Sequence, residues 1–239
     1  MMSIISEHGY RIDGRLPHQI RNINCRLGVY PQAEGSSYIE QGNTKILCAV
    51  YGPHEAKRSR QLQDRCVINC QYSVATFSGL ERKNRPRGDR KANEFTRLLE
   101  KTFESAIMIN AFPGSQIDIF CEVVQNDGSL LAACVNAATL ALCDAGIPMK
   151  ALVSASACGF VDSKCLVDLS NREETDLTPR MTVATLGNTS QIVLIELENR
   201  LHSNNLPQVL AQSTKTCADV FECLHAAVRA HLPGSVAIF

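Results

Sequence analysis

The chain has 239 residues, 45% of them hydrophobic and 20% charged, which is ordinary for a globular protein with one large domain or two small ones. Its 24 basic and 24 acidic residues give a formal net charge of zero, so nucleic-acid binding cannot be argued from total charge and must come from local patches. There is no tryptophan and aromatic residues make up 5%, which argues against an aromatic platform for stacked bases.

The eleven cysteines are an odd number, and most of them stand inside apolar runs, where cysteine behaves as a small hydrophobe. No pair has the spacing of a zinc knuckle and no histidine cluster completes a set of four ligands, so we expect reduced structural thiols and no metal. The N-terminus lacks a basic region followed by an apolar core, so we expect no signal peptide, and no apolar run is long enough to span a bilayer. The scattered histidines argue against a hidden catalytic triad.

In chain order, residues 1–15 are predicted to be a polar lead-in, and a loosely alternating segment follows up to Tyr30. Residues 36–40 and 45–51 are predicted to form paired strands around a turn at 41–43. A further strand is expected over 66–75, because it is rich in typical sheet residues.

Two helices alternate with strands in the middle of the chain. Asp89 can cap a helix that runs to about Ile109, because its apolar residues fall on one face. A strand over 117–124 and a helix over 130–145 come next.

The last part of the chain is expected to form strand hairpins and a final helix. The hairpins cover 152–161 with 164–169 and 181–186 with 191–197, and the long helix covers 206–231. This order predicts an α/β fold with helices packed on sheets, and the lack of an obvious linker predicts one domain over 1–239.

The most informative stretch begins where the apolar run Ile117 to Val124 ends in a glycine turn at Gly128, just before the small-residue helix. A strand, a glycine turn and a helix N-terminus make a ready anion site, because free N–H groups and the helix dipole point at the turn. An enzyme that handles phosphate usually adds an arginine here, whereas this chain has Leu130 and Leu131. The architecture of a phosphate site is present without its expected charge.

Basic residues gather in two loop regions. Six of the eleven residues from Glu81 to Lys91 are basic, and the last two, Arg90 and Lys91, stand at the predicted start of a helix, where cations oppose the dipole. That placement makes sense if phosphates dock there. A second basic set lies at Lys57, Arg58, Arg60 and Arg65. On composition alone, each set is more often a solvated loop than a binding site.

An acidic stretch follows the predicted strand that ends near Val167. It runs from Asp168 to Glu174, with Asp176 beyond. Taken alone, these carboxylates are best interpreted as a polar loop between strands.

Residues Asp127 to Leu131, with the sequence Asp-Gly-Ser-Leu-Leu, resemble the Asp-Gly-Gly-Thr-Arg segment of active members of the RNase PH family, which are phosphorolytic 3′-to-5′ exoribonucleases. The similarity covers nearly the whole chain, and the branch it resembles most is that of eukaryotic core ring subunits of the RNA exosome. Its other segments are 11–15, 35–38, 41–45, 132–148 and the acidic stretch. The resemblance implies an RNase PH-like α/β (α+β) fold, with two βαβα-type halves, mixed sheets and packed helices in one domain.

By the same resemblance, Gly128 and Ser129 match a phosphate loop, and Leu131 stands at the arginine position. Asp168 and Glu174 match two acids that support catalysis in active relatives through a divalent ion and acid chemistry. Glu174 is one methylene longer than its counterpart, which can displace a ligand by about 1 Å. We therefore expect a vestigial site, no catalytic residue, no cofactor and no enzymatic activity.

The resemblance further implies RNA contacts by Arg58, Ser59, Arg90 and Lys91 along a channel. The implied partners are other RNase PH-type subunits in a six-membered ring, S1- and KH-type cap subunits, an associated hydrolytic exoribonuclease and single-stranded RNA, with no membrane. The implied compartments are nucleus, nucleolus and cytoplasm, and the implied role is non-catalytic support of rRNA maturation and RNA turnover.

Two alternatives stay open at this point. An active phosphate-dependent exoribonuclease would need other residues or a neighbouring subunit to hold phosphate, and Arg172 is the nearest basic substitute. A small-molecule enzyme with an α/β fold is the second alternative, but it explains neither basic loop.

Overall fold

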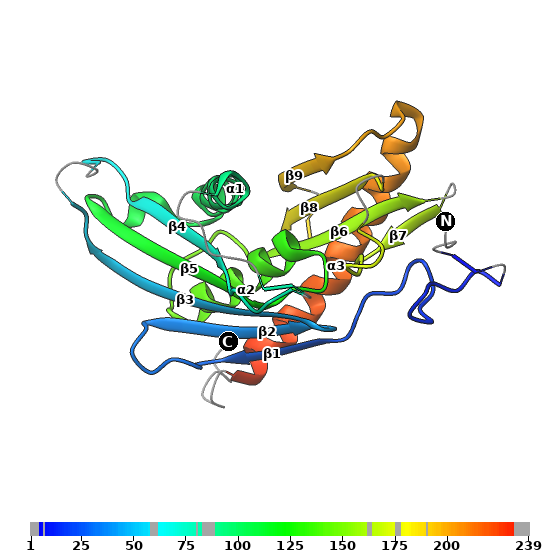
Figure 1. Cartoon of the computed structure of the whole chain (residues 1–239). Coiled ribbons are helices and arrows are strands. Elements are labelled where there is room, and N and C mark those ends of the chain that lie inside the picture. Colours follow the sequence, from blue (N-terminus) through cyan, green and yellow to red (C-terminus); the bar gives the residue numbers. More distant parts are fainter. Residues whose placement is uncertain are drawn as a thin grey trace.

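A computed structural model describes residues 5–6, 8–57, 62–79, 81–82, 89–161, 164–174, 178–189 and 191–231. Two β-sheets and three long helices make up this part of the chain (Figure 1). The strands are β1 (Ile23–Leu27), β2 (Gly35–Gln41), β3 (Thr44–Glu55), β4 (Val67–Val74), β5 (Ser115–Gln125), β6 (Val153–Val161), β7 (Lys164–Val167), β8 (Arg180–Leu186) and β9 (Ile192–Glu198). The helices are α1 (Arg90–Ala106), α2 (Leu130–Asp144) and α3 (Leu206–His231), with short 3-10 turns η1 (Ile109–Ala111) and η2 (Ser203–Asn205).

The first sheet has the strand order β1-β2-β3-β5-β4 and is mixed, because β4 runs parallel to β5 while the other pairs are antiparallel. The second sheet, β7-β6-β8-β9, is antiparallel throughout. The hairpins predicted from the sequence are confirmed, and so is the α/β architecture with mixed sheets. The loosely alternating segment contains β1, which pairs with β2 at the edge of the first sheet.

Helix α2 lies between the two sheets and contacts β2, β3 and β5 of the first and β6 and β8 of the second. Its small side chains let both sheets approach closely: a Cβ at Gly35 would lie 2.3 Å from the Ala141 carbonyl oxygen. Asn136, at the centre of the helix, is fully buried and exchanges two hydrogen bonds with the main chain of Ala155 in β6, at 2.8 and 3.0 Å. The two halves therefore share one hydrophobic core around α2.

The other two helices cover one face of each sheet. Helix α1 packs on β4 through a buried stripe that includes Leu99 and Phe103, and α3 packs on β6 and β8 and reaches β1. Asp89 is the N-cap residue of α1, but its side chain makes no capping hydrogen bond, so the predicted side-chain cap is wrong although the helix start is correct.

All eleven cysteines lie in the described part of the chain and are free thiols. Burial raises the pKa of the Cys158 thiol to about 12, so this group stays protonated and a weak nucleophile at neutral pH. No described helix is long and apolar enough to cross a membrane.

Candidate functional site

A cleft of about 1130 Å³ is lined by residues of α1, β4, β8 and β9 and by the start of α2. Four residues singled out from the sequence line it together: Lys91, Ser129, Leu131 and Glu174. Segments from both halves of the chain thus form one site.

The turn before α2 has the backbone geometry that the glycine predicted. Gly128 has a φ of 88°, and a Cβ there would lie 2.5 Å from the Leu169 carbonyl oxygen, so only glycine fits. Ser129 also adopts a left-handed conformation, with φ 55°, and its hydroxyl donates a hydrogen bond of 3.0 Å to the same Leu169 oxygen. The turn is therefore fixed directly against the acidic stretch.

The main-chain N–H of Ser129 donates a 2.6 Å hydrogen bond to Oε1 of Glu174. This N–H stands at the start of α2, where the helix dipole favours an anion. A carboxylate of the chain itself therefore occupies the position at which an inorganic phosphate would be expected to bind.

Leu131 lies in the first turn of α2 and is 3% exposed. Its side chain is part of the hydrophobic core. The position that the family resemblance assigns to an arginine thus supplies packing and no charge.

Glu174 has a pKa raised above its usual value because burial disfavours its charged form, although the Ser129 N–H and nearby arginines oppose the shift. Its second oxygen lies 3.4 Å from Nη1 of Arg180 in β8. Arg180 also pairs with Glu198 of β9 through two of its nitrogens. The arginine of the cleft is thus shared between two carboxylates of the protein.

Asp168 lies away from the cleft, with its side chain 1% exposed. Its carboxylate accepts hydrogen bonds from the main-chain N, Nε and Nη2 of Arg21 at 2.9, 2.9 and 2.7 Å. Burial tends to raise the pKa of Asp168, but the hydrogen bonds and charge of Arg21 outweigh it, so the net shift is downward. Asp168 is therefore an ionised, buried carboxylate that is paired with the Arg21 guanidinium.

A second buried pair lies beside the first. Arg11 donates from Nε to Oε1 of Glu173 at 2.7 Å and from Nη2 to the main-chain oxygen of Asp168 at 3.0 Å. The N–H of Val167 donates to the oxygen of Pro17 at 2.9 Å. The N-terminal segment is therefore docked on the acidic stretch, which corrects the expectation of a simple polar lead-in, and it holds the loop that carries Glu174.

Carboxylates outnumber cations among the described residues that line the cleft. The acids are Glu81, Asp89, Glu174, Glu196 and Glu198, and the bases are Lys91 and Arg180. Burial and the charge of Glu94 raise the pKa of Glu196. The exposed side chain of Lys91 lowers this pKa, but by less. Lys91 therefore already has a carboxylate neighbour, whereas the sequence suggested that only an external anion would favour it.

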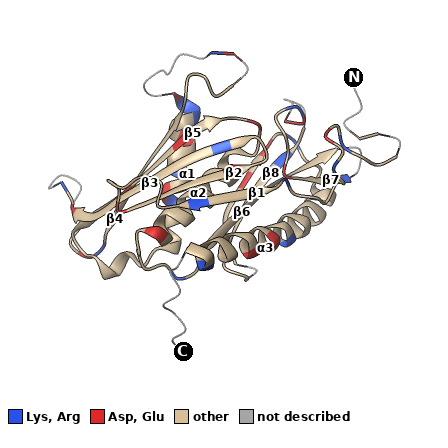
Figure 2. Cartoon of the chain, turned by 90° about the horizontal axis from the view of Figure 1, so that it is seen from below, with Lys and Arg blue, Asp and Glu red and all other residues tan. Residues whose placement is uncertain are grey.

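Of the other predicted RNA contacts, the structure describes Arg90. Arg90 is exposed at the first position of α1 and does not line the cleft. Arg58 and Ser59 lie outside the described residues. Basic and acidic residues are interspersed over both sheets and along α3 in the part of the ribbon that is coloured by charge (Figure 2).

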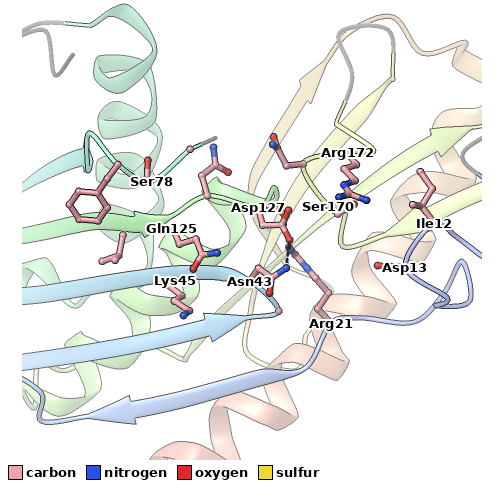
Figure 3. A pocket seen from close by; sticks show the side chains of 16 residues that line it. Ile12, Asp13, Arg21, Asn43, Lys45, Ser78, Gln125, Asp127, Ser170 and Arg172 are labelled. Atoms are coloured by element: carbon pink, nitrogen blue, oxygen red, sulfur yellow. Dashed lines mark hydrogen bonds and ion pairs between the residues drawn. The ribbon is translucent and has the colours of Figure 1, made fainter. Parts of the chain in front are cut away.

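Arg172, the substitute considered for holding phosphate, is exposed and lines a different hollow of about 770 Å³. In Figure 3 Arg172 and Ser170 stand across this hollow from Lys45 and Gln125. Arg172 is not among the residues that line the larger cleft. Within the described residues, no group of three His, Cys, Asp or Glu side chains could hold a metal ion.

The sequence analysis did not identify three arginines that form ion pairs with the acidic stretch. They are Arg11, Arg21 and Arg180. Arg11 belongs to one of the segments that carried the family resemblance, but a single sequence does not show which arginine becomes buried. Arg180 directly precedes the predicted strand over 181–186, and in the structure it is the first residue of β8.

Comparison with known proteins identifies the class of this fold and site. The 3′ exoribonuclease family matches in two consecutive parts, its domain 1 over residues 19–148 and its domain 2 over 151–230. The chain therefore belongs to the 3′ exoribonuclease family, the RNase PH family.

Individual members of this family are similar to the chain along nearly its whole length. The chain is 63% identical over 231 residues to the putative exosome complex component RRP41 of Caenorhabditis elegans, covering 97% of this chain and 96% of that protein. It is 51% identical over 233 residues to the exosome complex component RRP41 of Homo sapiens, covering 97% and 95%.

Two solved structures share the fold. Rice (Oryza sativa) Rrp46 matches with a TM-score of 0.83 at 23% identity, over 92% of this chain and 100% of that one. A chain of the Archaeoglobus fulgidus exosome with RNA bound to the active site matches with a TM-score of 0.78 at 22% identity, over 90% and 93%. These matches confirm the RNase PH-like fold expected from the sequence.

Proposed function

We propose that this chain is a non-catalytic, RNA-binding subunit of the core ring of the RNA exosome. In this role it supports 3′-to-5′ RNA processing and degradation, including rRNA maturation, by lining the central channel. The relatives named above support the assignment, because they match along nearly the full length of both chains and are exosome complex components.

The observation that carries the non-catalytic assignment is the hydrogen bond from the Ser129 N–H to Glu174. Phosphorolysis needs inorganic phosphate as the nucleophile. Here phosphate would have to displace a carboxylate from a helix start, beside a leucine rather than an arginine and in a cleft whose described lining has more acids than bases. Removing one group that stabilises the charge of the transition state, as the arginine would, costs about 3–4 kcal/mol. Two unfavourable features in one site argue for an inactive centre.

The RNA-binding part of the proposal rests on the basic residues. Arg90 and Lys91 are exposed at the start of α1, and we extend the path to Arg58 and Ser59 by family resemblance. The proposed partners are RNase PH-type neighbours in a six-membered ring, S1- and KH-type caps, and an associated hydrolytic exoribonuclease that receives the threaded RNA. The proposed compartments are the nucleus, nucleolus and cytoplasm.

The test is an RNA degradation assay on a reconstituted ring without the hydrolytic nuclease, in phosphate and magnesium. We expect no release of nucleoside diphosphates. Leu131→Arg alone should not restore release, because Glu174 still occupies the Ser129 N–H. Release that disappears in a ring carrying Glu174→Gln would favour the active phosphorolytic alternative. Asp168→Ala is a poor control, because Asp168 is buried against Arg21.

A further inference from the structure

Edge strands expose unpaired main-chain groups, and proteins normally protect them. The edge of β4 is protected by α1, since the N–H groups of Cys70 and Tyr72 donate to Glu100 Oε1 and Thr96 Oγ1 at 3.2 and 3.4 Å. The edge of β7 is protected by the N-terminal segment, through the bond from Val167 to Pro17.

The remaining two edges differ from each other. Strand β1 is short and carries exposed polar side chains at Asn24 and Arg26, which is a usual form of protection. Strand β9 has seven residues, Ile-Val-Leu-Ile-Glu-Leu-Glu, of high strand propensity. It pairs only with β8, and Figure 1 shows no described element beyond it.

Strand β9 also exposes large apolar side chains. Ile195 is 52% exposed and Leu197 is 44% exposed. They stand opposite Val183 and Met181 of β8, which are buried in the cluster beneath α3. The apolar face that α3 covers on the second sheet thus continues onto β9, where these two side chains remain about half exposed.

The opposite face of β9 is acidic. Glu196 and Glu198 line the cleft, and Glu198 is paired with Arg180. The pKa of Glu196 is raised by burial and by the neighbouring charge of Glu94, and the cations Arg180 and Lys91 do not offset this. Arg180 is paired with Glu174 and Glu198, and among the described residues Glu196 forms no ion pair, so a cation from outside would stabilise the charged form of Glu196.

We propose that the free edge of β9 pairs with an extended strand of a different protein chain, which is an RNase PH-type neighbour in the ring. The partner strand carries aliphatic side chains against Ile195 and Leu197 and a lysine or arginine against Glu196. The inference rests on the proposed ring membership and names the surface that mediates it. Main-chain pairing supplies affinity and the alternating side chains supply specificity, as in other strand additions.

A second copy of this chain is a poor occupant of the same edge. With all seven residues paired, antiparallel pairing of β9 with itself places the Glu196 side chains of the two copies at diagonal positions on one face. The strand itself supplies no cation to that face. The acidic face therefore selects a partner of different sequence.

The experiment uses the full chain, tagged and purified with its co-expressed RNase PH-type subunits. Native mass spectrometry reports whether a complex forms, and hydrogen exchange reports whether the outer-edge amides of β9 are protected in it. Ile195→Lys with Leu197→Lys should weaken association at least tenfold, and Glu196→Lys should weaken it as well. Met108→Lys is the control, because Met108 is 47% exposed and lies outside β9. Carbodiimide cross-linking should join Glu196 to a partner lysine, or Glu196 should resist cross-linking where the partner residue is arginine.

The outcomes separate the two proposals. Protected β9 amides together with loss of assembly in the β9 variants, but not in Met108→Lys, support the inference. A complex in which β9 stays unprotected, or in which the double variant assembles like wild type, overturns it and leaves the ring assignment standing. A cross-link from β9 to a second copy of this chain also overturns it. A chain that purifies without partner subunits overturns both proposals. If the double variant fails to fold, Glu196→Lys decides, since unchanged assembly of that variant refutes the charged contact.

Discussion

Replacing Asp168 should reveal a structural rather than a chemical role. The Asp168→Ala change removes a carboxylate that accepts three hydrogen bonds from Arg21 and leaves a guanidinium whose side chain is 7% exposed. Breaking a buried ion pair from one side costs about 3–5 kcal/mol, because an unpaired charge stays buried. We expect a loss near 3 kcal/mol, since Arg21 keeps the carbonyl oxygens of Asp127 and Gly128 as acceptors.

The control is Asp13→Ala. Asp13 pairs with Arg15 but is 37% exposed, so this pair should contribute at most about 1 kcal/mol. The assay is urea unfolding, followed by circular dichroism, of each variant purified with the same co-expressed RNase PH-type subunit at one concentration, which gives the difference in unfolding free energy between variants. A replacement of both partners, Arg21→Met with Asp168→Asn, should recover much of the loss, because neither charge then remains buried and asparagine tolerates the left-handed backbone of this position.

The effect of Asp168 has a defined pH dependence. Its pKa is lowered in the folded chain, so its contribution is fully present above the unfolded value of about 3.9 and is lost as pH falls through the folded value. The difference between wild type and Asp168→Ala should be constant from about pH 5 to 8 and should shrink in stronger acid. The reasoning is refuted if Asp168→Ala is no less stable than Asp13→Ala at pH 7.

Three further predictions follow from the fold and the charges. Gly128→Ala should lower the melting temperature more than Gly146→Ala, because both glycines have positive φ but only Gly128 would place a Cβ against a carbonyl oxygen; equal melting temperatures would contradict this. Arg90→Glu with Lys91→Glu in the ring should weaken RNA binding and lower the salt slope by about 0.7 per lost contact, measured across a salt series, and equal slopes would remove these residues from the RNA path. The chain alone, with its exposed apolar side chains, should be poorly soluble and rescued by a co-expressed RNase PH-type subunit, and a well-behaved monomer in size-exclusion chromatography would count against that.

Local patterns carried most of the fold prediction. The turn at Gly128, the helix after it and the strand hairpins follow from glycine chemistry and side-chain periodicity within short windows of sequence. The small residues of α2 indicate a helix that is packed closely on more than one side. The identity of the strands that it contacts depends on long-range packing.

The site was predicted less completely, because its decisive contacts join distant parts of the chain. Glu174 reaches Ser129 across 45 residues, and Arg21 reaches Asp168 across 147. Nothing near Arg21 in the sequence marks it as buried. Asp168 and Glu174 belong to one acidic stretch. Only the tertiary structure shows that Asp168 is paired with Arg21 while Glu174 lines the cleft.

Phosphate binding to the assembled ring tests the central claim most directly. Phosphorus-31 NMR of inorganic phosphate, titrated with the ring, would report binding at the Ser129 N–H without any need for turnover. We predict no saturable binding that depends on this chain, because Glu174 already occupies the N–H and Leu131 supplies no charge. Saturable binding that is lost in a ring carrying Ser129→Asp, which tolerates the left-handed backbone of this position and adds a carboxylate that repels phosphate, and retained in a ring carrying Met108→Lys would contradict the account.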